Sequence, residues 1–582
     1  MNDNRLSLLR HHFGDGHITR RQLVRRAGAL GISLPVVSAL LAACGGSSNA
    51  PSSTSAATSA TGGGATATKT PVTTINQNAT PSGSPAAAAT SAPLGKAGGS
   101  VTFVRGADSD NLDPVTNDGN INIWVFMSIY DQLIKVANNG LDLAPSLAEK
   151  WDTSADGTTF TFHIRQGVKF SDGTPMTVDD IKYSLNRAKT QKGDGDWTFT
   201  LAQVKDIASP DANTIVITLN EPWAPFLADI SMFNSSVISQ AFAQKIGEDK
   251  LNEQCMGTGP FALKAWNKAQ NIILVKNPNY WQQGLPLVDQ ITLNVVPDSN
   301  SRILQVKGGQ VDGDIGQNDV PLSSVADLKA QSDLQVINFV STYVNFVDIN
   351  CRNAPLSDVK VRQALNYATD KESLIKTILY GQADVSNSFM PNGALYWNKD
   401  QTGYPYDINK AKDLVSQSSS PNGVNISMDI GSGNQLSQQI ATALKSMWQP
   451  AGINLDIQQY EQAVATDRYR TNKFELRLTG WTNDIIDPDE LVSYAITPET
   501  NQNYHTGWVN QQAIDLAHQG EAELDPEKRR QIYYQIQKIH MDDAPFVYLY
   551  VLPYIDVLNK KVQGFFHHPM GQYDFTRMSV QS

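Results

Sequence analysis

The chain has 582 residues, of which 41% are hydrophobic and 18% charged, so it can build a large core in more than one domain. The formal net charge is −11; without the first 43 residues, which hold six Arg against two Asp, 40 basic and 55 acidic residues leave −15. Nucleic-acid binding needs clustered Lys and Arg that displace counterions from phosphates. The composition therefore excludes wholesale disorder and argues against a nucleic-acid partner.

The first 43 residues carry the pattern of an export signal. A basic segment that includes Arg20 and Arg21 precedes an uncharged apolar stretch, residues 27–43, which ends in small residues. A basic start, a short apolar run and a small-residue end are typical of a secretory signal peptide. The apolar run of about 17 residues also contains Pro35, whereas a membrane span needs roughly 20 apolar residues. We therefore predict that residues 1–43 form a signal peptide and not a stable membrane anchor.

Two short motifs refine this prediction. Arg20 and Arg21, with a hydrophobic residue two positions on, resemble a twin-arginine export signal, and the Leu-Ala-Ala-Cys-Gly end at residues 41–45 resembles a bacterial lipobox. The resemblance implies that Cys44 becomes a lipidated N-terminus, and several acyl chains hold a protein to a membrane durably. General export is the alternative to the twin-arginine route, and an ordinary signal with a chance cysteine is the alternative to lipidation.

Residues 44–96 are expected to be a lipidated Cys followed by a tether. The segment consists almost entirely of Ser, Thr, Ala, Gly, Pro and Asn, and Lys69 is the single charge between Gly45 and Gly95. Such a composition cannot bury enough apolar surface to fold. A flexible chain of roughly 50 residues has a root-mean-square span of about 40 Å. We predict a disordered tether that lifts the folded part off a membrane.

From residue 98 onward the sequence alternates between short strands, helices and turns. Asp156-Gly157 is a turn signal before a strand at residues 159–164. Thr177 and Asp180 form a capping box at the start of a helix. Further helices are predicted at residues 358–367, 437–448 and 526–540, and further strands at 271–276, 290–296, 474–478 and 545–552. This mixture without a regular period predicts an α/β or α+β protein of several lobes.

Sequence signatures of common enzymes are missing. The chain has no His-Glu-x-x-His, no Gly-x-Ser-x-Gly and no Walker A loop, and we predict no catalytic residue, no metal site and no cofactor. His567 and His568 are adjacent, and neighbouring side chains on an extended chain point in opposite directions, so we interpret them as surface or groove residues. Cys255 and Cys351 either pair in the exported protein or stay as free thiols.

Several motifs together resemble one known family, the family 5 extracellular solute-binding proteins, which are the peptide- and nickel-binding components of bacterial ABC importers. The resemblance covers residues 98 to 582. The motifs that carry it, in the order of the family, are residues 144–151 with 156–175, Gly257-Thr258-Gly259-Pro260-Phe261, Asn277-Pro278-Asn279-Tyr280-Trp281, Gly308-Gly309 with Val311-Asp312, residues 358–368, and Gly480-Trp481-Thr482-Asn483-Asp484 with Asp487-Pro488.

The resemblance implies an α/β, two-lobed periplasmic-binding-protein (Venus flytrap) fold with an extra inserted domain, in which the lobes close on a ligand by a hinge. By matching motifs, we place lobe I at residues 97–131, 221–340 and 549–582. The inserted lobe II falls at 132–220, and the opposing lobe III at 341–548.

The resemblance also points to binding residues. In peptide-binding relatives the aspartate that matches Asp484 pairs with the α-ammonium group of the ligand, while Gly480, Trp481 and Thr482 offer backbone groups to an extended peptide. The alternative for Asp484 is a solvated loop residue.

Two further groups complete the predicted site. Asp118, Gly119 and Asn120 match the segment that pairs with the other edge of the peptide, and Tyr548 is a further candidate for lining the cleft, although alternating aromatic residues in a strand often belong to a core. Dipeptide-specific relatives carry an arginine in the loop that matches residues 431–434, and this chain has none there, which argues against a ligand of fixed dipeptide length.

The predicted function is that of a monomeric, extracytoplasmic, lipid-anchored solute-binding protein on the outer face of the bacterial cytoplasmic membrane. It would capture peptides and deliver them to the permease and ATPase subunits of an ABC importer. One alternative is the same role for an oligosaccharide, because sugar sites favour aromatic side chains and the chain has ten Trp and nineteen Tyr. Another is an extracytoplasmic hydrolase or adhesin, for which Asp484 and Asp487 are the one carboxylate pair noticed near the cleft.

Overall fold

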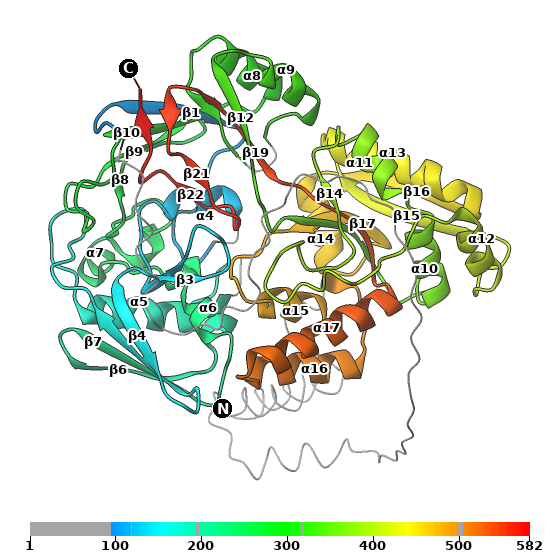
Figure 1. The fold of residues 1–582 in the computed structure, drawn as a ribbon, viewed down its shortest axis with the longest axis horizontal. Helices are drawn as coiled ribbons and strands as arrows, with labels where there is room; N and C mark the ends of the chain where they lie inside the picture. The colour runs from blue at the N-terminus through cyan, green and yellow to red at the C-terminus, as the bar shows by residue number, and fades with distance from the viewer. Residues whose placement is uncertain (1–94, 118, 194–196, 317–318, 499–503, 582) are drawn as a thin grey trace, which may run out of the picture.

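The computed structural model describes residues 95–117, 119–193, 197–316, 319–498 and 504–581 (Figure 1). The predicted signal peptide, Cys44 and nearly all of the predicted tether lie outside these residues, as does Asp118. Among the helices of the described part, none combines the length and the apolar character that a membrane crossing requires.

Three separate stretches of the chain build a seven-stranded sheet. In spatial order its strands are β12 (Leu334–Phe339), β19 (Tyr554–Asn559), β11 (Gly313–Asp314), β1 (Ser100–Arg105), β10 (Gln290–Val295), β9 (Asn271–Lys276) and β8 (Phe261–Asn267). β1 runs parallel to β10 and β11, and β19 runs antiparallel to β11 and β12. Because successive side chains point to opposite faces, Val101 and Phe103 enter one core cluster and Val104 enters another, beneath α8 (Ser299–Lys307) and α9 (Val325–Lys329).

A smaller antiparallel sheet is inserted between the first two of these stretches. Its strands are β4 (Ala148–Thr153), β5 (Thr159–Ile164), β7 (Thr214–Leu219) and β6 (Val204–Asp211), in that spatial order. In β5, Phe160, Phe162 and Ile164 are buried and alternate with half-buried residues, as the sequence pattern predicts. Helix α5 (Val178–Thr190) shares this core and begins at the predicted capping box, in which the Thr177 N–H donates to Asp180 Oδ2 over 2.9 Å.

A second large sheet has six strands. In spatial order these are β14 (Asp384–Val385), β18 (Phe546–Val551), β13 (Val344–Ile349), β17 (Leu476–Trp481), β15 (Val424–Gly431) and β16 (Ile453–Tyr460). Every residue of β13 and β18 is buried, because helices cover both faces. One face packs on α10 (Val359–Tyr367), α12 (Ile408–Ser416) and α13 (Gln435–Trp448), and the other on α15 (Asp489–Ala495), α16 (Gln511–Ala522) and α17 (Pro526–Asp543).

Most of the predicted elements occur with small changes at their ends. The helices predicted at 358–367, 437–448 and 526–540 are α10, α13 and α17, and the strand predicted at 271–276 is β9. The strand predicted at 474–478 is the exception, since β17 begins at Leu476 and continues to Trp481. The reason is tertiary: β13 supplies ladder partners along the whole strand, up to the pair Val344 and Trp481.

The chain crosses between the two large sheets twice, at residues 340–343 and 552–553. β18 stays in the six-stranded sheet as far as Val551, and β19 joins the seven-stranded sheet at Tyr554, so the crossing placed at residue 549 from the sequence comes too early. Pro553 marks the true break, because proline cannot donate a ladder hydrogen bond. The two crossing segments are joined to each other: the Leu552 N–H donates to the Tyr343 carbonyl oxygen over 3.3 Å, and the Ser341 hydroxyl donates to the Leu552 carbonyl oxygen.

The halves on either side of these crossings are in contact (Figure 1). Phe199, in the short 3-10 helix η1 (Trp197–Leu201), lies with its ring centroid 6.1 Å from that of Tyr494 in α15. The Ala224 N–H donates to the Glu521 carbonyl oxygen of α16 over 2.8 Å. One core cluster runs without a break from β1 and α4 (Asn120–Phe126) to α15, α16 and α17. The structure therefore shows the lobes closed on each other.

The structure locates the two adjacent histidines and the two cysteines of the folded part. His567 is fully buried, with Nδ1 2.7 Å from Asp556 Oδ2 and its ring stacked on Tyr554, so the interpretation as a surface or groove residue is wrong; the ring belongs to the core of the seven-stranded lobe. His568 is also buried. Cys255 and Cys351 are both free thiols, and burial raises their pKa values to about 12 and about 11.

Candidate functional site

Asp484 lies at the junction of the lobes, between the end of β17 and the start of α15. Its side chain is 5% exposed, and Oδ1 has no hydrogen-bond partner among the described residues. Burial, together with the negative charge of Glu490, holds its pKa well above the usual range. A buried carboxylate without a compensating cation is costly, so this oxygen is suited to receive a positively charged ligand group.

Glu490 supports the loop that carries Asp484. Its Oε2 accepts the backbone N–H groups of Asp484 over 2.8 Å and of Ile485 over 3.1 Å, and its Oε1 accepts the Trp481 indole N–H over 2.9 Å. Glu490 is fully buried in the first turn of α15, and burial raises its pKa to about 7. No sequence motif marks Glu490, because an acidic residue in the first helical turn is a common pattern and gives no sign of its long-range partners.

The edge of β17 next to Asp484 offers backbone groups. β15 pairs with β17 only at Leu476 and Arg477, whereas β13 pairs with it as far as Trp481. Within the described residues, the edge of β17 beyond Arg477 that faces away from β13 therefore has no ladder partner, which is the arrangement that accepts an added peptide strand. Gly480 is required here: a Cβ atom would lie 2.8 Å from ring atoms of Tyr343.

Aromatic rings form a wall across the lobe junction. The ring of Trp481 lies 4.7 Å from that of Tyr494, which in turn contacts Phe199 of the inserted lobe. Tyr504 packs against Trp481 with ring centroids 5.8 Å apart. Tyr494 thereby connects Trp481 to Phe199 on the other side of the junction.

Thr482 and Asn483 tie the same loop to the crossing segments. The Asn483 N–H donates to Thr342 Oγ1 over 3.1 Å, and the Thr342 N–H donates to the Pro569 carbonyl oxygen of the other lobe over 2.9 Å. Thr482 is buried beside Tyr554 of β19. Any movement at the crossings is therefore transmitted directly to the loop with Asp484.

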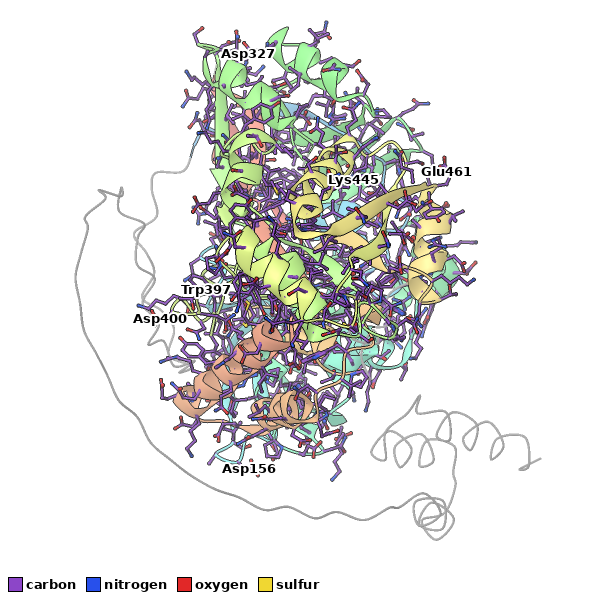
Figure 2. The ribbon with its side chains drawn as sticks, turned by 90° about the vertical axis from the view of Figure 1, so that its right-hand side faces the viewer. Asp156, Asp327, Trp397, Asp400, Lys445 and Glu461 are labelled. Atoms are coloured by element: carbon purple, nitrogen blue, oxygen red, sulfur yellow. The ribbon has the colours of Figure 1, made fainter. Side chains whose placement is uncertain are left out.

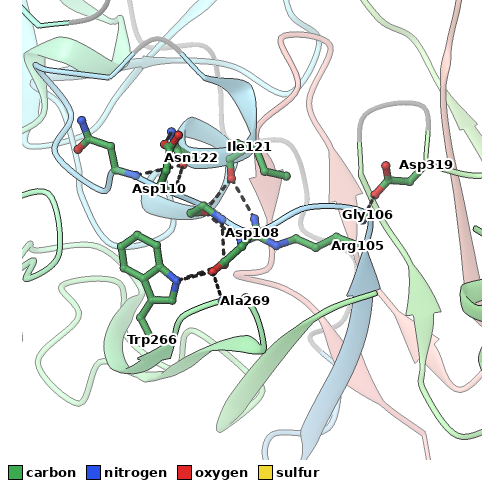
Figure 3. A network of polar contacts seen from close by, with 11 residues as sticks. Arg105, Gly106, Asp108, Asp110, Ile121, Asn122, Trp266, Ala269 and Asp319 are labelled. Carbon is green, nitrogen blue, oxygen red and sulfur yellow. Dashed lines mark hydrogen bonds and ion pairs between the residues drawn. The ribbon is translucent and has the colours of Figure 1, made fainter. Parts of the chain in front are cut away.

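The predicted segment across the cleft starts at Asp118, outside the described residues, and continues through Gly119 and Asn120 into α4. A polar network holds this start of α4 (Figure 3): Arg105 Nη1 donates to the Ile121 carbonyl oxygen over 2.9 Å, and the Ser109 hydroxyl donates to the same oxygen over 3.0 Å.

The same segment is connected to the loop of Asp484 through the inserted lobe. The Trp197 indole N–H donates to the Asn117 carbonyl oxygen over 2.7 Å, and Trp197 packs beside Phe199, which reaches Tyr494. A chain of contacts through Trp197, Phe199 and Tyr494 thus joins Asn117, which precedes this segment, to the lobe that carries Asp484.

Two other sequence-based candidates do not belong to this junction. The Tyr548 side chain is 1% exposed, and its hydroxyl donates to the His540 carbonyl oxygen over 2.9 Å. It packs between β18 and α17, so the structure assigns it to the core and not to a cleft wall. Asp487 forms a bidentate ion pair with the buried Arg529, so it is not available as the partner of Asp484 in hydrolytic chemistry.

A sequence model of the bacterial extracellular solute-binding proteins, family 5 middle region, matches residues 142–503. The chain belongs to this family, whose members bind solutes and are not enzymes. The structural neighbours are two-lobed periplasmic binding proteins with mixed α/β sheets, as expected from the sequence resemblance.

Curated relatives differ in what their names say they bind. Heme-binding protein A of Haemophilus influenzae is 29% identical over 478 residues, which cover 78% of this chain and 87% of the relative. The dipeptide-binding protein of Escherichia coli is 27% identical over 481 residues, covering 78% and 89%. The periplasmic binding protein DppA of Helicobacter pylori, solved with the peptide STSA, is 26% identical with a TM-score of 0.74, covering 84% of this chain and 99% of that one.

Proposed function

We propose that this protein captures peptides with a free amino terminus between its lobes and delivers them to an ABC importer. The observation that carries the proposal is the buried Asp484 carboxyl group at the lobe junction, where, among the described residues, one oxygen has no hydrogen-bond partner and no cation pairs with it. A peptide ammonium group would supply the missing charge through a charge-assisted hydrogen bond.

The backbone of the peptide would extend the six-stranded sheet along the open edge of β17, at Gly480 and Trp481. On the opposite side, the segment of Asp118, Gly119 and Asn120 is the proposed second edge. Recognition through backbone groups accepts many side chains. Arg468, which reaches β15 beside residues 431–434, is paired with Asp429 over 2.7 Å, so it is not a free partner for a peptide carboxylate at a fixed length.

We place the protein outside the cytoplasmic membrane as a monomer, exported through the signal with Arg20 and Arg21 and held by lipid on Cys44. Its proposed partners are a permease pair and two ATPases. Support comes from the sequence motifs at the N-terminus and from relatives that are named as a dipeptide-binding protein and as an ABC transporter-associated periplasmic binding protein.

The test is peptide binding by residues 97–582 and by the Asp484→Ala variant, measured by calorimetry with free-amine peptides and with their N-acetylated forms. A hydrogen bond to a charged group contributes about 1.5–3 kcal/mol, so the variant should bind free-amine peptides roughly 10- to 100-fold more weakly. Binding of acetylated peptides should change little. Equal losses for both forms would remove Asp484 from the ligand site.

One observation favours a second candidate, an oligosaccharide. The wall of Trp481, Tyr494 and Phe199 at the junction is the kind of surface on which sugars stack. A thermal-shift screen of refolded, ligand-free protein separates the two classes, because a ligand of the native state raises the midpoint by mass action. If only sugars stabilise the protein, the proposed transport role stands, but peptides are not its ligands.

A further inference from the structure

We propose that Asp484 and Glu490 form a proton-exchange site, in which Asp484 carries a proton in the empty clamp and the cationic group of the ligand replaces that proton. Glu490 is the positioning residue of this exchange. The inference rests on the proposed function in one respect, namely that the ligand presents an ammonium group. It goes further by stating that capture releases a proton, and by assigning a role to a residue outside the motif that resembles the family.

The geometry distinguishes the two carboxyl groups. Glu490 accepts three N–H donors, at 2.8, 2.9 and 3.1 Å, from Asp484, Trp481 and Ile485. Three donors stabilise the ionised form. Asp484 Oδ1 accepts none from the described residues. Of the two acids, Glu490 therefore ionises first, at a pKa of about 7, and Asp484 is the one that keeps the proton above that pH.

In the part of the chain that the structure describes, no cation pairs with Asp484. From β19, Tyr554 faces it with a neutral phenol whose pKa is raised by burial, and Tyr504 faces Glu490 in the same way. From α6 (Phe226–Ile230), Asp229 adds a further buried carboxyl group whose pKa is raised by burial and by acidic neighbours, Glu490 among them.

Arg529 of α17 supplies a guanidinium group in this region, but its N–H groups already have partners within the protein. It pairs with Asp487 through two nitrogens, donates to the Gly520 carbonyl oxygen over 2.7 Å and donates to the Tyr533 hydroxyl over 2.9 Å. Asp489 in the first turn of α15 is buried as well, with Oδ1 unpartnered among the described residues. The junction thus holds an excess of buried acid, and closure without ligand requires protons.

The exchange balances as follows. A protonated Asp484 gives its proton to solvent, the ligand ammonium group keeps its own protons, and the resulting carboxylate accepts a hydrogen bond from that ammonium. Affinity for free-amine ligands then rises with pH by up to about tenfold per unit, as long as Asp484 is protonated in the empty clamp. Acetylated peptides release no proton at this site, and their affinity should not follow this dependence.

The proton is counted by calorimetry at pH 7.5, above the pKa of about 7 of Glu490, in buffers of different ionisation enthalpy, with trialanine and N-acetyl-trialanine as probes. Wild-type protein should release about one proton per bound trialanine and none with the acetylated peptide. In Glu490→Gln the neighbouring charge is gone, so Asp484 ionises at lower pH and proton release should fall while binding persists. Glu461→Gln is the matched control, since Glu461 is an exposed acid of the same lobe (Figure 2), and it should behave as wild type.

A second measurement needs no ligand. The infrared band of protonated carboxyl groups, recorded on empty protein at pH 7.5, should lose intensity in Asp484→Asn and in Glu490→Gln, but not in Glu461→Gln. Trialanine binding without proton release, or a band unchanged in Asp484→Asn, would overturn the exchange and leave the peptide function standing. If no peptide binds but the band changes as expected, the proposed function is wrong. The conclusion that Asp484 is protonated in the empty protein would still stand.

Discussion

Gly480 shows how a single residue serves both packing and the proposed ligand edge. The ring of Tyr343, which comes from a crossing segment, occupies the space where a side chain at position 480 would begin. The residue pairs with Asn345 of β13 and lies beyond the point where β15 stops pairing. Glycine at position 480 leaves room for the Tyr343 ring beside the strand that is proposed to bind the peptide backbone.

We expect Gly480→Ala to destabilise the protein, because a Cβ atom at 2.8 Å from the ring forces Tyr343 to move. Overpacking of this kind costs about 1–3 kcal/mol. Urea unfolding should show the loss, and peptide affinity should fall with it. Gly431→Ala is the control in the neighbouring strand, since its Cβ would meet only the flexible end of Gln462 at 3.3 Å. A Gly480→Ala variant as stable as wild type would show that the Tyr343 ring moves freely.

At the scale of elements, α6 and α15 bring acidic residues from the two halves together. Asp229 is buried and accepts the Trp223 indole N–H over 2.7 Å. Burial first, and then the charges of Asp487 and Glu490, raise its pKa well above the usual value, against the opposing effect of Arg529. Contact between these two elements therefore depends on protonation.

The sign of the pH dependence follows from linkage. An acid with a raised pKa in the folded state binds more protons folded than unfolded, so its contribution to stability is present below the unfolded pKa of about 3.9 and is lost as pH rises. Asp229→Asn retains an oxygen for Trp223 and removes the ionisation. In thermal unfolding between pH 4 and pH 8, the unfolding midpoint of the variant should rise relative to that of wild type as the pH increases.

Asp327→Asn provides the comparison, because Asp327 is an exposed acid (Figure 2) whose pKa is lowered by its hydrogen bond and charge interaction with Lys307. Its small contribution to the pH dependence of stability is expected to have the opposite sign. If the midpoints of Asp229→Asn and wild type run parallel over the whole pH range, Asp229 is not protonated in the folded protein.

The boundaries of the helices and strands show where local sequence signals are sufficient to predict an element. The capping box at Thr177 and Asp180 and the alternation in β5 predicted both elements correctly, since the interactions involved join residues close in the chain. The end of β17 was placed too early, at residue 478, whereas the strand predicted at 545–552 is β18. β17 continues because a distant strand, β13, pairs with it up to Trp481.

At the scale of the whole molecule, the two crossing segments connect the lobes. The crossing segments are bonded to each other and, through Thr342, to the loop that leads to Asp484. Two lobes joined in this way can close around a ligand as a population shift that contacts with both lobes drive. Phe199 of the inserted lobe adds a contact that exists only when the lobes meet.

Attachment to a membrane is the prediction at this scale that the sequence alone supports. Cys44→Ser should release the protein from the membrane fraction, because the acylated thiol is the proposed anchor. Fractionation of cells that express either form, followed by immunoblotting, measures this. Retention of Cys44→Ser in the membrane fraction would mean that the lipobox interpretation is wrong, while a signal-sequence variant at Arg20 and Arg21 tests export separately.

The sequence by itself determined the family, the order of most elements and the position of Asp484 within a motif, because these depend on short segments read along the chain. Only the tertiary structure decided which groups surround that aspartate. Glu490 accepts its backbone N–H, Arg529 is taken by Asp487, and Tyr548 turns into the core. Charge and burial sum over all neighbours in space, and most of those neighbours come from strands and helices far away in the chain.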